Sequence, residues 1–410
     1  MIPINKKKII NDPVYGFINI SSDFVFDIIE HEYFQRLRRI KQLGLTYYVY
    51  PGAVHTRFQH VIGATHLMKI AIDVLKNKGV EISNEEEEAT ILAILLHDMG
   101  HGPFSHTLEH SFVTNISHEE ISLLFMEEFN KIFNGKLTLA IDIFKNNYHK
   151  KYLHQLVSSQ LDMDRLDYLQ RDSFFTGVSE GIVGFERIIK MLNVYNNEIV
   201  VDAKGIYSIE NFLIARRLMY WQVYLHKTVV VTEQILTKIL IRAKQLYKFD
   251  KNLFTTPALK FFMENEIDSL EKFKSLDAIR IFSQLDDFDI MTSIKIWTNH
   301  SDKILSFLCK SLINRRLFKI EIQKENEFEK IKTDEIKQKM KVQFSVNDED
   351  VEFLVFTGKI YNKAYSRNKD EIINILYNNG DLVDIAKASD ISNVSVLSKS
   401  VVKYFLCYPK

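Results

Sequence analysis

The chain of 410 residues contains little cysteine, proline or glycine, with 2 Cys, 6 Pro and 14 Gly. Its cysteines, Cys309 and Cys407, are far apart and form no CxxC pair, which excludes a disulfide framework and a thiolate metal site. We therefore expect a cytoplasmic protein in a reducing environment. Because proline and glycine interrupt helices, their scarcity favours a chain made largely of helices.

The sequence also lacks a net charge and a long apolar run. Lys+Arg and Asp+Glu each number 53, so no overall field draws the chain to nucleic acid or to an anionic membrane. Nucleic acid stays possible as a partner, but the charge does not imply it. No segment is long and uncharged enough to span a bilayer, and no apolar stretch follows the basic N-terminus. We expect no membrane partner, and any anion must bind at a local cluster.

Apolar residues recur mostly at helical spacing, which predicts a mainly α fold. The segment from Glu85 to Asp98 is the clearest case, because Ser83 and Glu86 can form a capping box and ATILAILLHD follows. A helix that is apolar all round runs through a core. We therefore expect His97 and Asp98, at its end, to emerge from the interior.

The residue pattern changes after Arg316. LFKIEIQ and KVQFSV alternate like strands, and VEFLVFTGKIY follows them. The Lys/Glu-rich stretch from Lys324 to Lys341 is much more typical of a solvated helix than of a regulatory surface. We predict a helical domain over residues 1–315 and a small α/β subdomain over residues 316–410.

Four segments supply most of the candidate nitrogen and carboxylate donors: TRFQH ending at His60, HDMGHGPFSH from His97 to His106, SHEE around His118, and LDMDRLDYLQRD from Leu161 to Asp172. Each alone is typical of packed histidines or solvated carboxylates. Together, His97 and Asp98 at the buried end of a helix, with His60 and a later Asp, form a mixed nitrogen and oxygen set. Such ligands suit Mn, Fe, Mg, Ni or Zn, with positions open for water and phosphate oxygen.

These segments resemble the successive motifs of HD-domain deoxynucleoside triphosphate triphosphohydrolases, the family of the sterile-alpha-motif and HD-domain dNTPases and their bacterial homologues. The similarity also covers KIINDPVYG, YFQRLRRIKQLGLTYYVYPGA, YLHK and RRLFK, and it is weakest at the far C-terminus. The HD motif occurs with several reactions, whereas the flanking RLRRIKQLG context is more specific. The resemblance implies an HD-type helical bundle as the core, and we expect no sterile alpha motif before it.

The resemblance also implies a set of site residues. The implied metal ligands are His60, His97, Asp98 and Asp164. The implied catalytic residues are His118 as general acid or base, Glu119 orienting it, and His101 beside the scissile phosphate. The implied phosphate contacts are Arg57, Arg165 and Arg216, with Arg165 standing where a relative carries Lys. The implied sugar contacts are Gln42, Leu43, Tyr168 and Asp172, with Tyr224 packing near sugar and base and disfavouring a ribose 2′-hydroxyl.

A nucleotide activator and a homo-oligomer, a dimer or a tetramer, are further implications of the resemblance. The matching positions are Lys8, Asn11, Gln35, Arg38, Lys204 and Lys227. Glu30 replaces the Asp that reads guanine, and Asp202 stands where an Arg is expected, so the base of the activator stays open. Each of these basic residues alone is equally typical of a solvated surface.

The resemblance implies a metal-dependent hydrolase that cleaves a dNTP to a deoxynucleoside and inorganic triphosphate. Two alternatives stay open. One is an HD-domain phosphodiesterase or phosphomonoesterase acting on another nucleotide, and the other is a non-catalytic binder of nucleotides or single-stranded nucleic acid.

Overall fold

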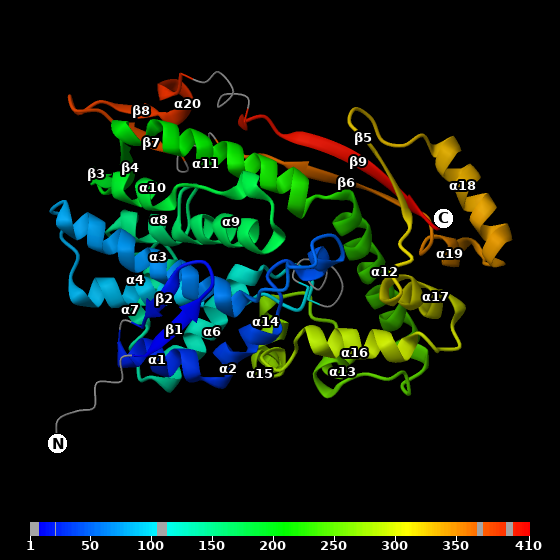
Figure 1. The fold of residues 1–410 in the computed structure, drawn as a ribbon. Coiled ribbons are helices and arrows are strands. Elements are labelled where there is room, and N and C mark those ends of the chain that lie inside the picture. Colours follow the sequence, from blue (N-terminus) through cyan, green and yellow to red (C-terminus); the bar gives the residue numbers. More distant parts are fainter. Residues whose placement is uncertain (1–7, 21, 105–112, 367–371, 391–396) are drawn as a thin grey trace.

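The computed structural model describes residues 8–20, 22–104, 113–366, 372–390 and 397–410. Helices dominate the described residues, which confirms the mainly α prediction (Figure 1). No helix among these residues is both long and apolar enough to cross a membrane. His106, the last residue of the HDMGHGPFSH motif, lies outside the described residues.

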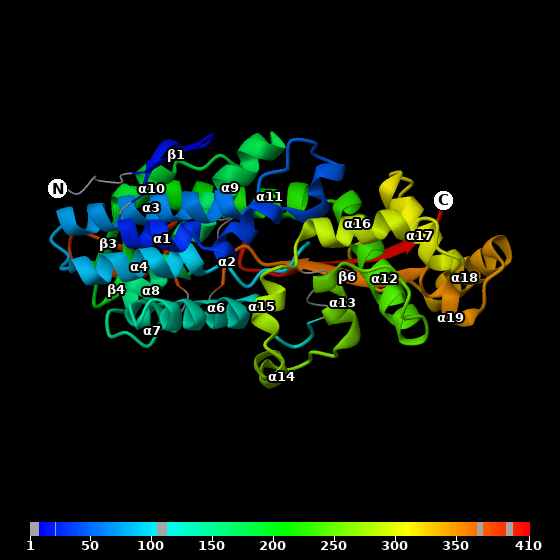
Figure 2. The same cartoon turned by 90° about the horizontal axis from the view of Figure 1, so that it is seen from below.

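Packed helices of the first 250 residues form the body that carries the site. The long helix α3 packs against both α4 and α9, and α4 also contacts α7 and α8 (Figures 1 and 2). The α-helices of this body are α1 (Asp23–Glu30), α2 (Glu32–Gln35), α3 (Arg57–Asn77), α4 (Asn84–Leu96), α6 (His118–Ile132), α7 (Thr138–Phe144), α8 (Lys151–Val157), α9 (Met163–Thr176), α10 (Phe185–Met191), α11 (Ile206–Met219) and α12 (Lys227–Phe249). Its short turns of 3-10 or π helix are η1 (Arg36–Arg39), η2 (Gly44–Tyr48), η3 (Ser179–Gly181), η4 (Ala203–Gly205) and η5 (Tyr220–Tyr224).

Helix caps fix the helix ends on which the site is built. Helix α4 begins with the predicted capping box of Ser83 and Glu86 and is buried from Ala89 to Leu96. Ser117 and Glu120 form the same box at the start of α6. The side chain of Asp162 accepts a hydrogen bond from a backbone N–H at the start of α9. The caps therefore hold the first turns of α6 and α9, and burial holds the last turn of α4.

A second group of helices follows α12. It contains α13 (Pro257–Glu264), α14 (Leu270–Ser275), α15 (Ala278–Phe282), α16 (Asp287–Trp297) and α17 (Lys303–Ile313), and α17 packs against both α12 and α16. The remaining helices are α18 (Lys330–Phe344), α19 (Asp348–Val351) and α20 (Ile385–Ala388).

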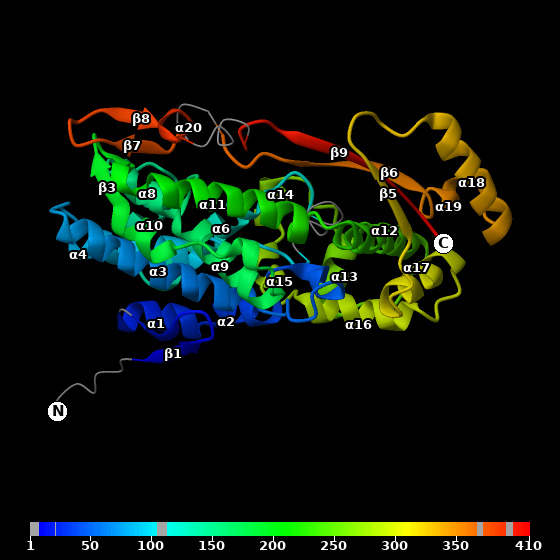
Figure 3. The ribbon, with the colours of Figure 1, turned by 45° about the horizontal axis from the view of Figure 1, so that its top comes forward.

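Three small sheets complete the described structure. The antiparallel hairpin of β1 (Ile9–Asp12) and β2 (Gly16–Asn19) lies near the N-terminus. A four-stranded sheet has the order β3 (Leu192–Tyr195), β4 (Glu198–Asp202), β7 (Asn374–Leu376) and β8 (Leu382–Asp384), with β4 parallel to β7. A three-stranded antiparallel sheet has the order β5 (Lys319–Gln323), β9 (Val401–Tyr408) and β6 (Phe356–Asn362), and Figure 3 shows it at the end of the molecule near α12.

The C-terminal part agrees with the sequence prediction in two places and corrects it in another. KIEIQ forms β5, and the Lys/Glu-rich stretch lies largely in α18. KVQFSV was expected to be a strand, but α18 continues to Phe344 and ends at Ser345, whose φ is 53°. Strands β7 and β8 join the sheet of β3 and β4, so the C-terminal part is tied to the helical body. The domain boundary at residue 315 stays a prediction.

Candidate active site

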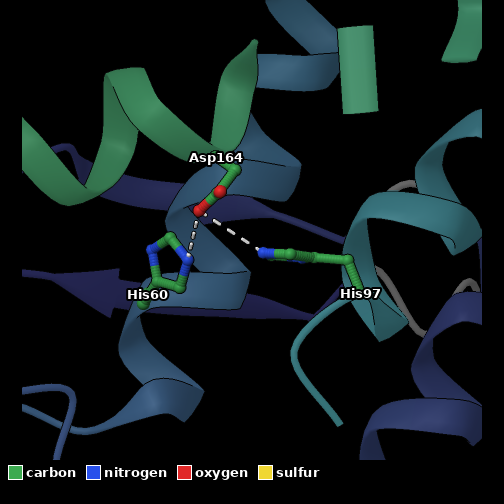
Figure 4. A group of neighbouring side chains, drawn as sticks. All are labelled: His60, His97 and Asp164. Atoms are coloured by element: carbon green, nitrogen blue, oxygen red, sulfur yellow. Dashed lines mark ion pairs between the residues drawn. The ribbon is translucent and has the colours of Figure 1, made fainter. Parts of the chain in front are cut away.

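The ends of α3, α4 and α9 bring His60, His97 and Asp164 together. His60 lies in the first turn of α3, His97 directly follows α4, and Asp164 lies in the first turn of α9. Oδ1 of Asp164 is 3.0 Å from Nε2 of His60 and 3.4 Å from Nε2 of His97 (Figure 4). One candidate ligand atom from each residue lies within 4.8 Å of the other two. These three of the four predicted metal ligands therefore meet at one point.

The outer nitrogens of the two imidazoles fix the rings with Nε2 facing this point. Nδ1 of His97 is 2.6 Å from the backbone oxygen of Ile94, and Nδ1 of His60 is 2.7 Å from Oδ2 of Asp167. An oxygen accepts in each contact, so Nδ1 donates and Nε2 is left for a ligand. Among the described residues, neither buried Nε2 makes a hydrogen bond of acceptable geometry. Two such nitrogens beside a carboxylate fit a divalent metal ion.

Asp98 lies between the trio and the side chains of Arg57 and His101. Its oxygens are 3.5 Å from Nε2 of His97 and 3.8 Å from Nε2 of His60. The same carboxylate is 2.5 Å from Nη1 of Arg57 and 3.2 Å from Nε2 of His101. Asp98 is therefore adjacent to the trio while also holding Arg57, and its role as a fourth metal ligand stays a prediction.

The electrostatics of this cluster favour a bound cation. Burial opposes charge on His60, yet the carboxylates of Asp164, Asp167 and Asp98 outweigh it and raise the pKa of His60 to about 10. Burial likewise opposes charge on Asp164, but its contacts with the two histidines hold the pKa of that carboxyl well below its usual range. The negative charge thus draws a proton onto His60 when no metal is bound. A divalent ion would take the place of that proton.

A cavity of about 710 Å³ opens beside the trio. Its lining includes most of the predicted residues: Gln42, Leu43, Arg57, His97, Asp98, His101, His118, Glu119, Asp164, Arg165, Tyr168, Asp172 and Tyr224. His60, which is fully buried, and Arg216 are not among the lining residues. The lining also contains residues that the sequence did not single out, among them Phe104, Phe144, His154 and Tyr220. Candidate metal, catalytic and substrate groups therefore share one cavity.

Positive charge lines the cavity or lies close to it. Arg165 pairs with Asp162 through Nη1, while its buried Nε has no hydrogen-bond partner among the described residues. Nε and Nη1 of the buried Arg216 likewise have no such partner, and its charge acts on the neighbouring Tyr168. Residues in the first turns of α3, α6 and α9 also line the cavity, so three helix N-termini add partial positive charge. This arrangement favours a polyanionic ligand.

His118 and His101 face the cavity as a stacked pair. Their ring centroids are 3.9 Å apart with an interplanar angle of 18°. Burial, together with the charge of Arg57, lowers the pKa of His101 to about 3, so His101 is neutral at pH 7. Nε2 of His118 is 3.2 Å from Oε1 of Glu119, and this contact lowers the pKa of Glu119 to about 2. An ionised Glu119 therefore lies beside the imidazole of His118, where it can orient the ring.

Asp172 is held by two residues, one of which sequence analysis missed. Tyr224 donates its hydroxyl to Oδ2 of Asp172 at 2.8 Å, and Nε2 of His55 lies 2.7 Å from Oδ1. His55 is stacked on Phe175 at a centroid distance of 4.5 Å. His55 directly precedes the TRFQH motif, but its contact with Asp172 spans 117 positions in sequence and follows no local pattern.

The positions of the predicted activator set lie on separate elements of one chain. Lys8 precedes β1 and Asn11 lies on it; Gln35 and Arg38 lie on α2 and η1; Lys204 lies on η4, and Lys227 begins α12. Arg38 donates to Oε1 of Gln35 at 2.8 Å and covers the ring of Phe58 at 3.5 Å. Asp202 is bound to Lys78 at 2.8 Å within the chain. Whether these positions form a nucleotide site stays a prediction.

Comparison with family models matches two adjacent regions. The HD domain matches residues 57–172, which contain His60, His97 and Asp164. The HD associated region matches residues 183–256, which contain Arg216 and Tyr224. Both matches lie within the helical body that carries the cavity.

Whole-chain comparisons agree with these matches. An uncharacterized protein of Bacillus subtilis, YwfO, is 36% identical over 322 residues, which are 77% of this chain and 72% of that protein. The deoxynucleoside triphosphate triphosphohydrolase SAMHD1 homolog of Dictyostelium discoideum is 31% identical over 60% of this chain and 51% of its own length. The crystal structure of a phosphohydrolase from Bacteroides thetaiotaomicron has a TM-score of 0.95 and 53% identity, and the match covers 99% of this chain and 100% of that one.

Proposed function

Because the chain belongs to the HD-domain phosphohydrolase family, we propose that it is a metal-dependent dNTP triphosphohydrolase. The observation that carries this proposal is the meeting of His60, His97 and Asp164 beside a cavity that arginines, tyrosines and a histidine pair also line. The reaction adds water to the α-phosphorus and breaks its bond to O5′, which gives a deoxynucleoside and inorganic triphosphate.

Metal ligation is assigned to His60, His97, Asp98 and Asp164. The donor set of nitrogen and carboxylate oxygen without thiolate suits Mn, Fe, Mg, Ni or Zn. A bound divalent ion would supply Lewis acidity at the α-phosphoryl oxygen and a water of lowered pKa. The tautomers of His60 and His97 support this assignment, because both Nε2 atoms face the same point.

The cationic groups are assigned to the triphosphate. The guanidinium groups of Arg57, Arg165 and Arg216 match phosphate oxygens in shape and charge. The buried nitrogens of Arg165 and Arg216 that have no hydrogen-bond partner in the described part of the chain support this assignment, since a phosphate oxygen would satisfy them. Arg57 already neutralises Asp98, so it links the metal side of the cavity to the phosphate side.

The proton that the leaving O5′ requires is assigned to His118. Glu119 lies beside His118 and orients it, whereas His101 stays neutral, has its Nε2 3.2 Å from Oδ1 of Asp98, and is assigned a place beside the phosphate. Gln42, Leu43, Tyr168 and Asp172 are assigned to the sugar. Tyr224 lies beside them and disfavours a 2′-hydroxyl, so ribonucleotides are the poorer substrates in this proposal.

The products test this function. Purified protein is incubated with each dNTP and each of the five candidate metals, and the products are separated by mass. We expect deoxynucleoside and inorganic triphosphate. Pyrophosphate or orthophosphate would instead identify an HD phosphodiesterase or phosphomonoesterase. Binding of nucleotide with no product under any metal would identify a non-catalytic binder.

Nucleotide-driven assembly is proposed for regulation. A symmetric dimer that pairs into a tetramer would bring Lys8, Arg38 and Lys227 of different chains to one nucleotide. A ligand shifts assembly only by binding the larger form more tightly than the smaller one. The oligomer mass and the specific activity should therefore rise together with nucleotide concentration, and the activity should rise sigmoidally. Light scattering measures the oligomer mass, and initial rates measure the specific activity. A mass and a rate that are independent of nucleotide would contradict this regulation and leave the catalytic proposal intact.

A further inference from the structure

A buried series of charged side chains connects the β1–β2 hairpin to the candidate metal site. Nη1 of Arg171 donates to Oδ2 of Asp12, the last residue of β1, at 2.7 Å. Nε and Nη2 of Arg171 donate to the two oxygens of Asp167 at 2.9 and 3.0 Å. Oδ2 of Asp167 in turn lies 2.7 Å from Nδ1 of His60. Strand β1 thus reaches a proposed metal ligand through three hydrogen-bonded contacts.

The surrounding structure makes room for this series and excludes water from it. His60, Asp167 and Arg171 are 0% exposed and Asp12 is 4% exposed. A Cβ at Gly63 of α3 would lie 2.1 Å from Nη2 of Arg171 and 2.1 Å from Oδ1 of Asp167. Glycine is therefore required where α3 passes these side chains. An unpaired charge at such depth is costly, so each member depends on the next.

The turn of the hairpin holds Asp12 in place. Its Oδ1 accepts hydrogen bonds from the backbone N–H groups of Val14 and Tyr15 at 2.9 and 3.1 Å. The ring of Tyr15 lies 5.5 Å from the guanidinium carbon of Arg171. Oδ2 of Asp12 is therefore directed at Arg171 by the conformation of the hairpin.

We propose that Asp12 and Arg171 are positioning residues through which the hairpin sets the metal affinity of His60, an inference that rests on the proposed metal site. With Asp12 ionised, Arg171 divides its charge between two carboxylates, and Asp167 keeps negative charge with which to polarise the Nδ1–H of His60. With a neutral residue at position 12, Arg171 neutralises Asp167, and His60 becomes a weaker ligand.

This arrangement gives the proposed activator site a route to the metal. Asn11, a member of the activator set, directly precedes Asp12 on β1, and Lys8 lies just before the strand. A nucleotide bound at these residues would act on the strand that presents Asp12. Activation would then include tighter metal binding.

The test compares Asp12→Asn with wild type and with Asp27→Asn, which makes the same change at an exposed carboxylate of α1. Calorimetric titration of metal-free protein with Mn²⁺ measures the affinity directly. We expect Asp12→Asn to bind about tenfold more weakly and Asp27→Asn to bind as wild type. At saturating Mn²⁺, turnover of Asp12→Asn should return to within about twofold of wild type, which general damage to the fold would not allow.

The outcomes separate this inference from the proposed function. Equal Mn²⁺ affinity in Asp12→Asn and wild type would overturn the role of Asp12 alone, whereas a wild type that binds no divalent metal would overturn the metal site itself.

A second measurement needs no variant at position 12. In zinc-loaded wild type, nuclear magnetic resonance of ¹⁵N-histidine should show a hydrogen-bonded proton on Nδ1 of His60, assigned by its loss in His60→Gln. An Nδ1 of His60 that carries no proton would contradict the hydrogen-bonded series from Asp12 to His60.

Discussion

Asp164→Ala is expected to abolish metal binding and to lower turnover by more than about 100-fold. Loss of a residue that only supports a metal ligand already lowers metal affinity or activity by about 10- to 100-fold, and loss of the ligand itself should cost more. Oδ1 of Asp164 is the carboxylate oxygen that approaches both Nε2 of His60 and Nε2 of His97. Without it the ion would lose the anionic ligand that lies between two neutral imidazoles and would keep only Asp98 as a proposed carboxylate ligand. Calorimetric titration with Mn²⁺ and initial rates on dNTP measure both losses.

Asp73→Ala is the matched control for this change. Asp73 lies on α3, the helix of His60, and its half-exposed carboxylate pairs with Lys69 on the surface of that helix. Such a surface pair contributes little to stability, so metal affinity and rate should equal those of wild type. An Asp164→Ala protein that still bound one metal per chain at wild-type affinity would show that the trio is not the metal site.

His118→Ala is expected to lower kcat by about 10²- to 10⁴-fold, the usual contribution of a positioned acid or base. Nucleotide and metal affinity should stay near those of wild type, because His118 lies outside the trio formed by α3, α4 and α9. The two binding constants and the single-turnover rate distinguish lost proton transfer from lost binding.

His149→Ala provides the comparison for His118→Ala, since His149 is exposed and distant in sequence from the motifs. Its rate should equal that of wild type. If His118→Ala also hydrolysed dNTP at the wild-type rate, the proton would have to come from another group, and the role assigned to His118 would be wrong.

Local sequence patterns were sufficient for the helix that leads into the site. The capping box at Ser83 and Glu86 and the apolar run after it predicted both α4 and the emergence of His97 and Asp98 from the core. These features act within a few residues of one another, so they can be recognised without knowledge of the fold. The same holds for KIEIQ, whose alternation predicted β5.

The strand predicted for KVQFSV was wrong because alternation over six residues is weak evidence. Helix α18 is largely solvent-exposed, so its side chains show no single apolar face, and Val342 is 82% exposed. No glycine or proline interrupts the segment before Ser345. Helix propensity and the left-handed cap at Ser345 therefore decided the local structure.

The partners that support the site could not be found from spacing. Asp167 lies in the same LDMDRLDYLQRD segment as Asp164, but its contact with His60 joins residues 107 positions apart, and the contact of Arg171 with Asp12 joins residues 159 positions apart. A carboxylate behind a candidate metal-ligating histidine is a general expectation. Which carboxylate fulfils it is decided by how α3 and α9 pack.

The hydrolysis of dATP in H₂¹⁸O by metal-loaded protein tests the central claim most directly. Water addition at the α-phosphorus with cleavage of the bond to O5′ predicts inorganic triphosphate that carries one ¹⁸O atom and deoxyadenosine that carries none. Mass spectrometry of the two products reads both labels in one experiment. Label in the nucleoside, or release of dAMP with pyrophosphate in place of triphosphate, would contradict the reaction proposed for this site.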